Sequence, residues 1–239
     1  METHNQWISG TNWICLPKDD IDVWKFSLNL KQDDRTVLSQ DELLELDRPD
    51  STIKRERRIC GRAHLRRILS LYTGSDPSKI SFEYGKNSKP ALSEHPKLSF
   101  NLSHSKNIGL ITVGYSRRIG IDVEHLETER PFSKIAERFL TKTENDFING
   151  YPEEELSRAF YRIWTLNEAY LKALGTGLSV SSNDFSILPN DPKGKFLKET
   201  TVPEDVPENW IFETLEAGPD YSGALCFESP VGNIRYWNI

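Results

Sequence analysis

Hydrophobic residues recur at two different spacings along this chain of 239 residues. Over residues 23–30 they stand at every second position, which is typical of a strand with one buried face. Shorter runs rich in β-branched residues, separated by polar turns, predict further strands. These runs cover residues 97–105, 107–116, 118–124, 210–218, 223–229 and 234–238.

Between these runs the hydrophobic spacing becomes helical. Residues 53–72 carry one apolar stripe that ends before Gly74, and residues 155–177 carry a second stripe that ends in glycines. We expect shorter helices over residues 39–46 and 131–140. Long helices mixed with short strands, without regular alternation, predict an α+β fold. A loop near Lys106 is our expected midpoint, which divides the chain into 1–105 and 106–239.

Composition and charge narrow the functional classes. The chain has 36 acidic and 30 basic residues, so its net charge of −6 disfavours a general polyanion binder. No apolar run approaches the ~18–20 residues of a membrane span, and the first ten residues lack the features of a secretory signal. Three widely spaced cysteines form no disulfide or zinc pattern. We therefore expect a cytoplasmic protein without a membrane partner.

Basic residues are concentrated over residues 54–67, where seven stand against one acidic residue. Arginine binds phosphate oxygens through two parallel hydrogen bonds, so this run is a candidate phosphate site. The alternative is a solvated helix face. Nucleic acid is a weaker candidate because no aromatic residues are interleaved with the charges.

Carboxylates stand at strand and helix positions that suit a metal ion. Asp122 and Glu124 are two residues apart on a predicted strand, so both project from the same face, and such oxygen ligands suit Mg²⁺. Glu168 lies at the rim of the second helical stripe, with Lys172 one turn later. The alternatives are the solvent face of an amphipathic strand and a helix-surface pair that contributes only ~0.2–0.5 kcal/mol.

Two polar positions within these elements carry further information. Asn167 lies near the middle of the apolar stripe, where an unbonded amide is costly, so we expect that helix to pass a polar cleft. Ser103 and His104 are adjacent on a strand and point opposite ways, which disfavours a nucleophile–base pair and hence a hydrolase. Beside a phosphate, His104 would act as a hydrogen-bond donor.

Four motifs in this order resemble the Sfp-type 4′-phosphopantetheinyl transferases, the group that includes the cyanobacterial enzymes. They are Lys89-Pro90, FNLSHS at residues 100–105, GIDVE at residues 120–124, and FYRIWTLNEAYLKALGTGLS at residues 160–179. The basic run from residue 55 to residue 69 also looks like that family's basic helix. The resemblance covers roughly residues 39–179.

The resemblance implies two similar α+β halves related by a pseudo-twofold axis, with the active site at their interface. The implied reaction depends on Mg²⁺, with Mn²⁺ as the alternative ion. It moves 4′-phosphopantetheine from coenzyme A to a serine hydroxyl of an acyl or peptidyl carrier protein, and it releases adenosine 3′,5′-bisphosphate. We expect a monomer that has no nucleic-acid partner and binds the carrier along residues 125–150.

Carried over to this sequence, the resemblance assigns roles to individual residues. Asp122, Glu124 and Glu168 are the expected metal ligands. Glu168, or Glu124 as second choice, is the expected acceptor of the serine proton, with Lys172 as the further catalytic group. The expected coenzyme-binding residues are Arg48, Arg55, Arg62, Lys89, Ser103, His104, Asp122 and Lys172.

The sequence departs from the family pattern at two places. Asn167 stands where that helix usually has lysine, so we expect a missing charged contact near the active centre. Glu45 and Pro49 stand where the family has an arginine and an aromatic residue before the basic helix. Because the three carboxylates remain, we expect activity to survive. The alternatives are a non-catalytic module that binds coenzyme A or a nucleotide, and a Mg²⁺-dependent protein that acts on nucleic acid.

Overall fold

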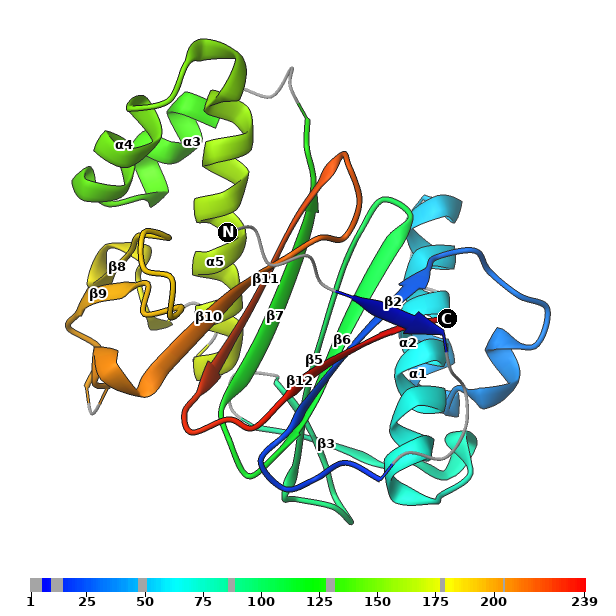
Figure 1. Ribbon diagram of the computed structural model, residues 1–239. Coiled ribbons are helices and arrows are strands. Elements are labelled where there is room, and N and C mark those ends of the chain that lie inside the picture. The colour runs from blue at the N-terminus through cyan, green and yellow to red at the C-terminus, as the bar shows by residue number, and fades with distance from the viewer. Residues whose placement is uncertain are drawn as a thin grey trace.

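Two β-sheets pack against each other at the centre of the molecule, and a long helix covers the outer face of each (Figure 1). The structure is a computed structural model. It describes residues 6–9, 15–46, 51–85, 89–127, 132–176, 179–203 and 205–239.

The larger sheet has five strands. Their order is β1 (Trp7–Ser9), β12 (Ile234–Asn238), β2 (Ile21–Ser27), β6 (Ile108–Tyr115) and β5 (Leu98–Ser105). Helix α2 (Thr52–Thr73) packs its apolar face on this sheet, and the short helix α1 (Gln40–Leu46) precedes it. Ser51 caps the start of α2, and Gly74 ends it with φ 70°.

The smaller sheet has three strands in the order β10 (Trp210–Leu215), β11 (Tyr221–Glu228) and β7 (Ile119–His125). Helix α5 (Leu156–Leu174) covers its outer face. Helix and strand approach each other closely at Gly120, where an added Cβ would lie 2.0 Å from the carbonyl oxygen of Ala169. Only glycine lets β7 approach the helix this closely.

Smaller elements complete the chain. Helices α3 (Phe132–Phe139) and α4 (Lys142–Asn149) pack against the first half of α5. Two short hairpins are formed by β3 (Phe82–Tyr84) with β4 (Pro90–Leu92), and by β8 (Phe185–Ile187) with β9 (Leu197–Thr200). Within the described residues, no helix is long and apolar enough to cross a membrane.

The strand order repeats between the two sheets. The strands β2, β5 and β6 of the larger sheet correspond to β7, β10 and β11 of the smaller one: a long helix follows the first strand, and the first strand pairs with the last, β2 with β6 and β7 with β11. The α+β prediction is confirmed, and this repeat accords with two similar halves. Our expected division at residues 105 and 106 falls inside the β5–β6 hairpin. Strand β12 returns to the larger sheet from the end of the chain, so no single position separates the two sheets, and the division stays a prediction.

Most predicted elements are present, whereas the short strands β1, β3, β4, β8 and β9 and the helix α4 were not predicted. Strand β2 is buried on both faces, since Ile21 and Val23 are as buried as Trp24 and Phe26; the second sheet covers the face expected to meet solvent. Helix α4 was not predicted, because only two of its eight residues are hydrophobic. Its signal was the capping box of Thr141 and Glu144.

Candidate active site

Strands β5 and β7 lie next to each other where the two sheets meet, and side chains join them. Alternate residues of β5 accept hydrogen bonds from backbone N–H groups of β7. We call this contact the seam. Its bonds are Ile121 N to Asn101 Oδ1 at 2.9 Å, Val123 N to Ser103 Oγ at 3.4 Å, and His125 N to Ser105 Oγ at 3.0 Å.

Asp122 is the centre of a buried charged cluster beside the seam. Its Oδ1 accepts hydrogen bonds from Ser103 Oγ at 2.8 Å and from Lys172 Nζ at 2.6 Å. The ammonium group of Lys172 also donates to Ser103 Oγ at 2.9 Å. The other oxygen of Asp122, Oδ2, is buried and has no hydrogen-bond partner among the described residues. A buried, unpaired carboxylate oxygen is costly, so this one favours a cationic ligand.

Glu124 and Glu168 flank this cluster. Glu124 is half-buried, and its Oε2 accepts a hydrogen bond of 2.9 Å from Ser105 Oγ. Glu168 lies on α5, one turn before Lys172. Burial raises the pKa of the Glu168 carboxyl, and the negative charge of Asp122 raises it further. Glu168 therefore lies near enough to Asp122 for their charges to interact.

These carboxylates do not form a ready-made metal site. Among the described residues, no three acidic, histidine or cysteine side chains stand in such an arrangement. Asp122 is paired with Lys172, and Glu124 with Ser105. The buried Oδ2 of Asp122 and the raised pKa of Glu168 nevertheless suit a divalent cation, so the predicted ligand set stays a prediction.

His104 lies on the other face of β5, beside α2. An added Cβ at Gly61 of that helix would lie 3.5 Å from the imidazole ring. His104 is exposed in part, yet burial by the surrounding protein lowers its pKa. The positive charges of Lys172, Arg57 and Arg58 lower that pKa further. The basic residues Arg57 and Arg58 of α2 therefore lie near enough to His104 for their charges to act on it.

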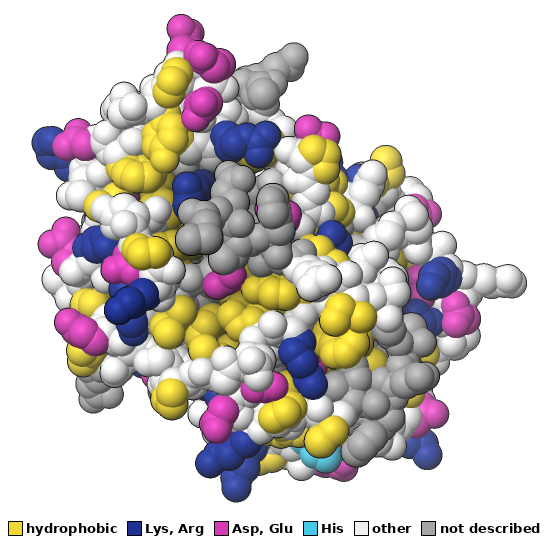
Figure 2. Space-filling model, viewed as in Figure 1, with side chains coloured by type: hydrophobic (Ala, Val, Ile, Leu, Met, Phe, Trp, Pro, Cys, Tyr) yellow, Lys and Arg dark blue, Asp and Glu magenta, His cyan; other side chains and the backbone are white. Residues whose placement is uncertain are grey.

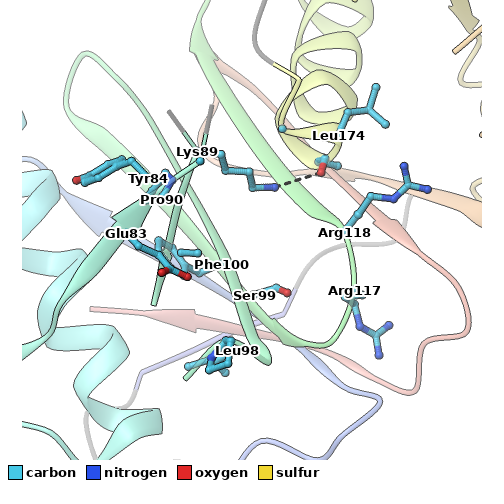
Figure 3. Close-up of a pocket in the computed structure, with 15 residues that line it drawn as sticks. Glu83, Tyr84, Lys89, Pro90, Leu98, Ser99, Phe100, Arg117, Arg118 and Leu174 are labelled. Carbon is cyan, nitrogen blue, oxygen red and sulfur yellow. Dashed lines mark hydrogen bonds between the residues drawn. The ribbon is translucent and has the colours of Figure 1, made fainter. Parts of the chain in front are cut away.

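Lys89 is held by the end of α5. Its Nζ donates hydrogen bonds to the backbone carbonyl oxygens of Ile119 at 3.0 Å, Lys172 at 2.6 Å and Ala173 at 3.2 Å. Figure 3 shows this side chain reaching from the segment before β4 toward the helix. Burial lowers the pKa of Lys89 to about 8. The stem also lies against Gly175, where φ is 66° and an added Cβ would lie 2.9 Å from Lys89 Cδ.

A pocket of about 530 Å³ opens beside Lys89 (Figure 3). Tyr84 and Phe100 give it aromatic surface, and Arg117 and Arg118 stand on its far side. The guanidinium group of Arg62 on α2 donates to the hydroxyl of Tyr84 at 3.3 Å, so the basic helix borders this pocket. Aromatic surface next to cationic side chains suits a nucleotide.

The predicted site residues fall into three groups. Ser103, Asp122 and Lys172 are in direct contact, with Glu124, Glu168 and His104 around them. Arg62 and Lys89 border the pocket, and Arg55 is half-buried near the start of α2. Arg48 lies outside the described residues.

The polar cleft expected beside Asn167 is wrong. Asn167 is only 3% exposed and faces Glu144, whose buried carboxylate accepts hydrogen bonds from Thr141 N at 2.9 Å and Ile187 N at 3.0 Å. The helical stripe is interrupted by a polar residue because a buried acid of α4 packs there.

Three functional candidates were not predicted from the sequence: Ser105, Arg57 and Arg58. Ser105 holds Glu124, and Arg57 and Arg58 act electrostatically on His104. The spacing of Asn101, Ser103 and Ser105 was a usable signal, because side chains two residues apart on a strand share a face.

Comparison with known proteins places these residues in a family context. A family model of the 4′-phosphopantetheinyl transferase superfamily matches residues 118–226. The chain is 34% identical over 194 residues to the 4′-phosphopantetheinyl transferase HetI of Nostoc sp. (strain PCC 7120), covering 78% of this chain and 82% of that protein. It is 30% identical over 178 residues to the 4′-phosphopantetheinyl transferase Sfp of Bacillus subtilis (strain 168), covering 73% and 75%.

A solved structure also matches part of the chain. It is a crystal structure of a holo-(acyl-carrier-protein) synthase from Bacillus anthracis str. Ames in complex with CoA (3′,5′-ADP). The match has 30% identity and a TM-score of 0.39, and it covers 47% of this chain and 96% of that chain.

Proposed function

Because the chain belongs to the 4′-phosphopantetheinyl transferase superfamily, we propose that it moves 4′-phosphopantetheine from coenzyme A to a serine hydroxyl of an acyl or peptidyl carrier protein. Adenosine 3′,5′-bisphosphate is the second product. The observation that carries this proposal is the cluster in which Lys172 of α5 meets Asp122 of β7 and Ser103 of β5. It places an ammonium group and a buried carboxylate where the two sheets join.

Asp122, Glu124 and Glu168 hold Mg²⁺ in this proposal, with Mn²⁺ as the alternative ion. The buried, unpaired Oδ2 of Asp122 and the raised pKa of Glu168 support this assignment. Oxygen ligands from carboxylates and phosphates are those that Mg²⁺ prefers. When bound, the ion supplies positive charge that neutralises the diphosphate of coenzyme A.

The side chains of the cluster perform the remaining steps. The serine oxygen forms a bond to the phosphorus that bears the pantetheine arm. The bond from that phosphorus to the bridging oxygen breaks, and its electrons leave with adenosine 3′,5′-bisphosphate. Glu168 accepts the serine proton, a role that its raised pKa favours, with Glu124 as second choice. Lys172 and His104 supply positive charge and a hydrogen-bond donor to the phosphate oxygens.

The nucleotide end of coenzyme A occupies the pocket beside Lys89 in this proposal. Tyr84 and Phe100 offer aromatic surface to the adenine, and Arg62 borders the pocket from α2. We assign the 3′-phosphate to the basic side of α2, with Arg55 and Arg62 as its contacts. Arg48 joins them on the family resemblance alone.

The carrier protein docks along residues 125–150, which include α3 and α4. Lys134, Arg138 and Lys142 are exposed there, and Phe139 is 40% exposed. Figure 2 shows hydrophobic side chains reaching the surface over this region, with Lys and Arg beside them. An acidic carrier surface would complement these charges despite the net charge of −6.

We also propose that the protein acts as a monomer in the cytoplasm. A single chain supplies every residue assigned above, which supports a monomer. The three cysteines are unpaired, and Cys60 and Cys226 are buried, which supports a reducing compartment.

A mass-shift assay tests the proposed reaction. The protein is incubated with coenzyme A, Mg²⁺ and each of several apo carrier proteins, and the carrier mass should rise by one phosphopantetheine arm. If coenzyme A binds and no carrier gains mass, the non-catalytic binding module is correct. If DNA binds with a steep salt dependence and coenzyme A does not, the chain acts on nucleic acid.

A further inference from the structure

The seam repeats one arrangement at successive positions of β5. At each of these positions, a polar side chain of β5 accepts a hydrogen bond from a backbone N–H group of β7. That N–H group belongs to the residue that follows the one opposite the β5 side chain. Ser103 accepts from Val123 N and donates to Asp122 Oδ1, while Ser105 accepts from His125 N and donates to Glu124 Oε2. Ser103 and Ser105 therefore make the same two hydrogen bonds, one from a backbone N–H group and one to the carboxylate of the preceding acid.

Asn101 gives an internal comparison within the seam. Its Oδ1 accepts from Ile121 N at 2.9 Å, and the neighbouring residue of β7 is Gly120, which has no side chain. Joining the strands requires only an acceptor, which Asn101 provides without a hydroxyl. A hydroxyl stands only at the two positions where β7 carries an acid.

From this pattern we infer that Ser105 is a positioning residue, which fixes the carboxylate of Glu124 by bridging it to the backbone of its own strand. The inference rests on the proposed function, in which Glu124 is a metal ligand. It adds a residue that contacts neither the ion nor coenzyme A.

The chemistry of a hydroxyl explains why serine suits this position. Serine has one O–H donor, and its oxygen also accepts hydrogen bonds. The N–H of His125 points at Oγ and cannot reverse its direction, so the oxygen accepts there and its proton turns to Glu124. The bond to an ionised carboxylate is charge-assisted, and such bonds hold ligand side chains in place.

Mn²⁺ binding, followed by electron paramagnetic resonance of the free ion with coenzyme A present, tests the inference without a turnover measurement. We expect Ser105→Ala to weaken Mn²⁺ binding by about tenfold, the lower range for loss of a group that orients a metal ligand. The matched control is Ser222→Ala. Ser222 pairs with Glu124 across the sheet, and its hydroxyl bonds to Thr165 Oγ1 at 3.0 Å, so its loss should leave Mn²⁺ binding unchanged.

A second pair of variants guards against a folding defect. Ser105→Thr keeps the hydroxyl, whereas Ser105→Val replaces it with a methyl group in a side chain of the same shape. We expect the threonine variant to bind Mn²⁺ as the unmodified protein does, and the valine variant to bind about tenfold more weakly. Thermal melting of each variant confirms that it is folded.

The outcomes separate this inference from the function beneath it. If Ser105→Ala and Ser105→Val bind Mn²⁺ as tightly as the unmodified protein, Ser105 has no positioning role and the proposed function stands. The same conclusion follows if Ser222→Ala weakens binding as much as Ser105→Ala. If the unmodified protein binds no Mn²⁺ even with coenzyme A, the proposed metal site is itself wrong, and the inference is overturned with it.

Discussion

The Nζ atom of Lys89 lies 2.6 Å from the backbone carbonyl oxygen of Lys172. Lys89 precedes β4 in the first half of the chain, whereas Lys172 belongs to the last turn of α5 in the second half. The side chain of Lys172 then reaches Asp122 at 2.6 Å. A lysine of one half thus holds the helix turn from which another lysine enters the proposed site.

Replacing Lys89 tests that connection. In Lys89→Met three carbonyl oxygens lose their shared donor, so we expect a loss of about 1–3 kcal/mol in the free energy of unfolding and a higher KM for coenzyme A. Urea denaturation and initial rates measure both. Lys198→Met is the control, since its exposed ammonium bonds to a single carbonyl. An unchanged KM in a folded Lys89→Met variant would place Lys89 outside the positioning of Lys172.

Lys172 itself should act on coenzyme A. We expect Lys172→Ala to raise the KM for coenzyme A by about tenfold or more, because a charge-assisted hydrogen bond contributes about 1.5–3 kcal/mol. Initial rates over a range of coenzyme A concentrations measure the effect, with the exposed Lys198→Ala as control. A KM equal to that of the unmodified protein would mean that this ammonium does not contact the phosphates.

Asp122→Asn keeps the shape of the side chain and removes its charge. We expect transfer to fall by more than about 100-fold, because loss of a metal ligand exceeds the effect of losing an orienting group. The carrier mass shift over time gives the rate. Glu199→Gln, which removes an exposed carboxylate on β9, is the control. Unchanged rates at limiting Mg²⁺ would remove Asp122 from the metal site.

The raised pKa of Glu168 gives a pH prediction for stability. The folded protein retains the Glu168 proton to a higher pH than the unfolded chain, whose glutamate pKa is about 4.3. The stability that Glu168 contributes is therefore complete below that pH and is lost as pH rises through the folded pKa. Glu168→Gln does not titrate, so it should be more stable than the unmodified protein at pH 7, with a smaller difference near pH 4.

Urea midpoints at the two pH values, together with the transfer rate, check this prediction. Glu168→Gln should gain stability at neutral pH and lose transfer activity, which is the usual relation for a residue placed for catalysis. Glu199→Gln, on the exposed face of β9, serves as control. A stability difference that does not depend on pH would contradict the assigned cause.

Asn167→Lys tests the departure from the family pattern. Because position 167 faces the buried Glu144, the new ammonium group would pair with that carboxylate. We expect kcat/KM for transfer to change by less than about threefold, within the range of a change that does not touch the transition state. Initial rates on one carrier protein decide it. A large gain would show that residue 167 acts on the reaction itself.

The sequence predicted those parts of the site that depend on local spacing. Asp122 and Glu124 share a strand face, and Lys172 follows Glu168 by four positions, which is about one helix turn. Gly74 and Gly175 end the long helices as their residue type indicates. These features need no knowledge of what packs against the element.

Contacts between distant segments were beyond the same reading. Lys89 was expected beside coenzyme A, and nothing in its neighbourhood indicates that its ammonium group bonds to carbonyls more than eighty residues later in the chain. The interpretation of Asn167 was wrong for the same reason. Its neighbour Glu144 belongs to helix α4, and the few hydrophobic residues of α4 did not predict a helix there. The seam pairs residues twenty positions apart, and their register appears only once both strands are placed.

Strand β12 lies between β1 and β2 and is parallel to both, although it follows every strand of the second sheet in the chain. During synthesis, β1 and β2 cannot be joined in the larger sheet until residues 234–238 have been made, because β12 pairs with both. The first half is therefore a poor candidate for expression on its own, and splitting the protein between its sheets should yield a fragment that aggregates through the open edge of β2.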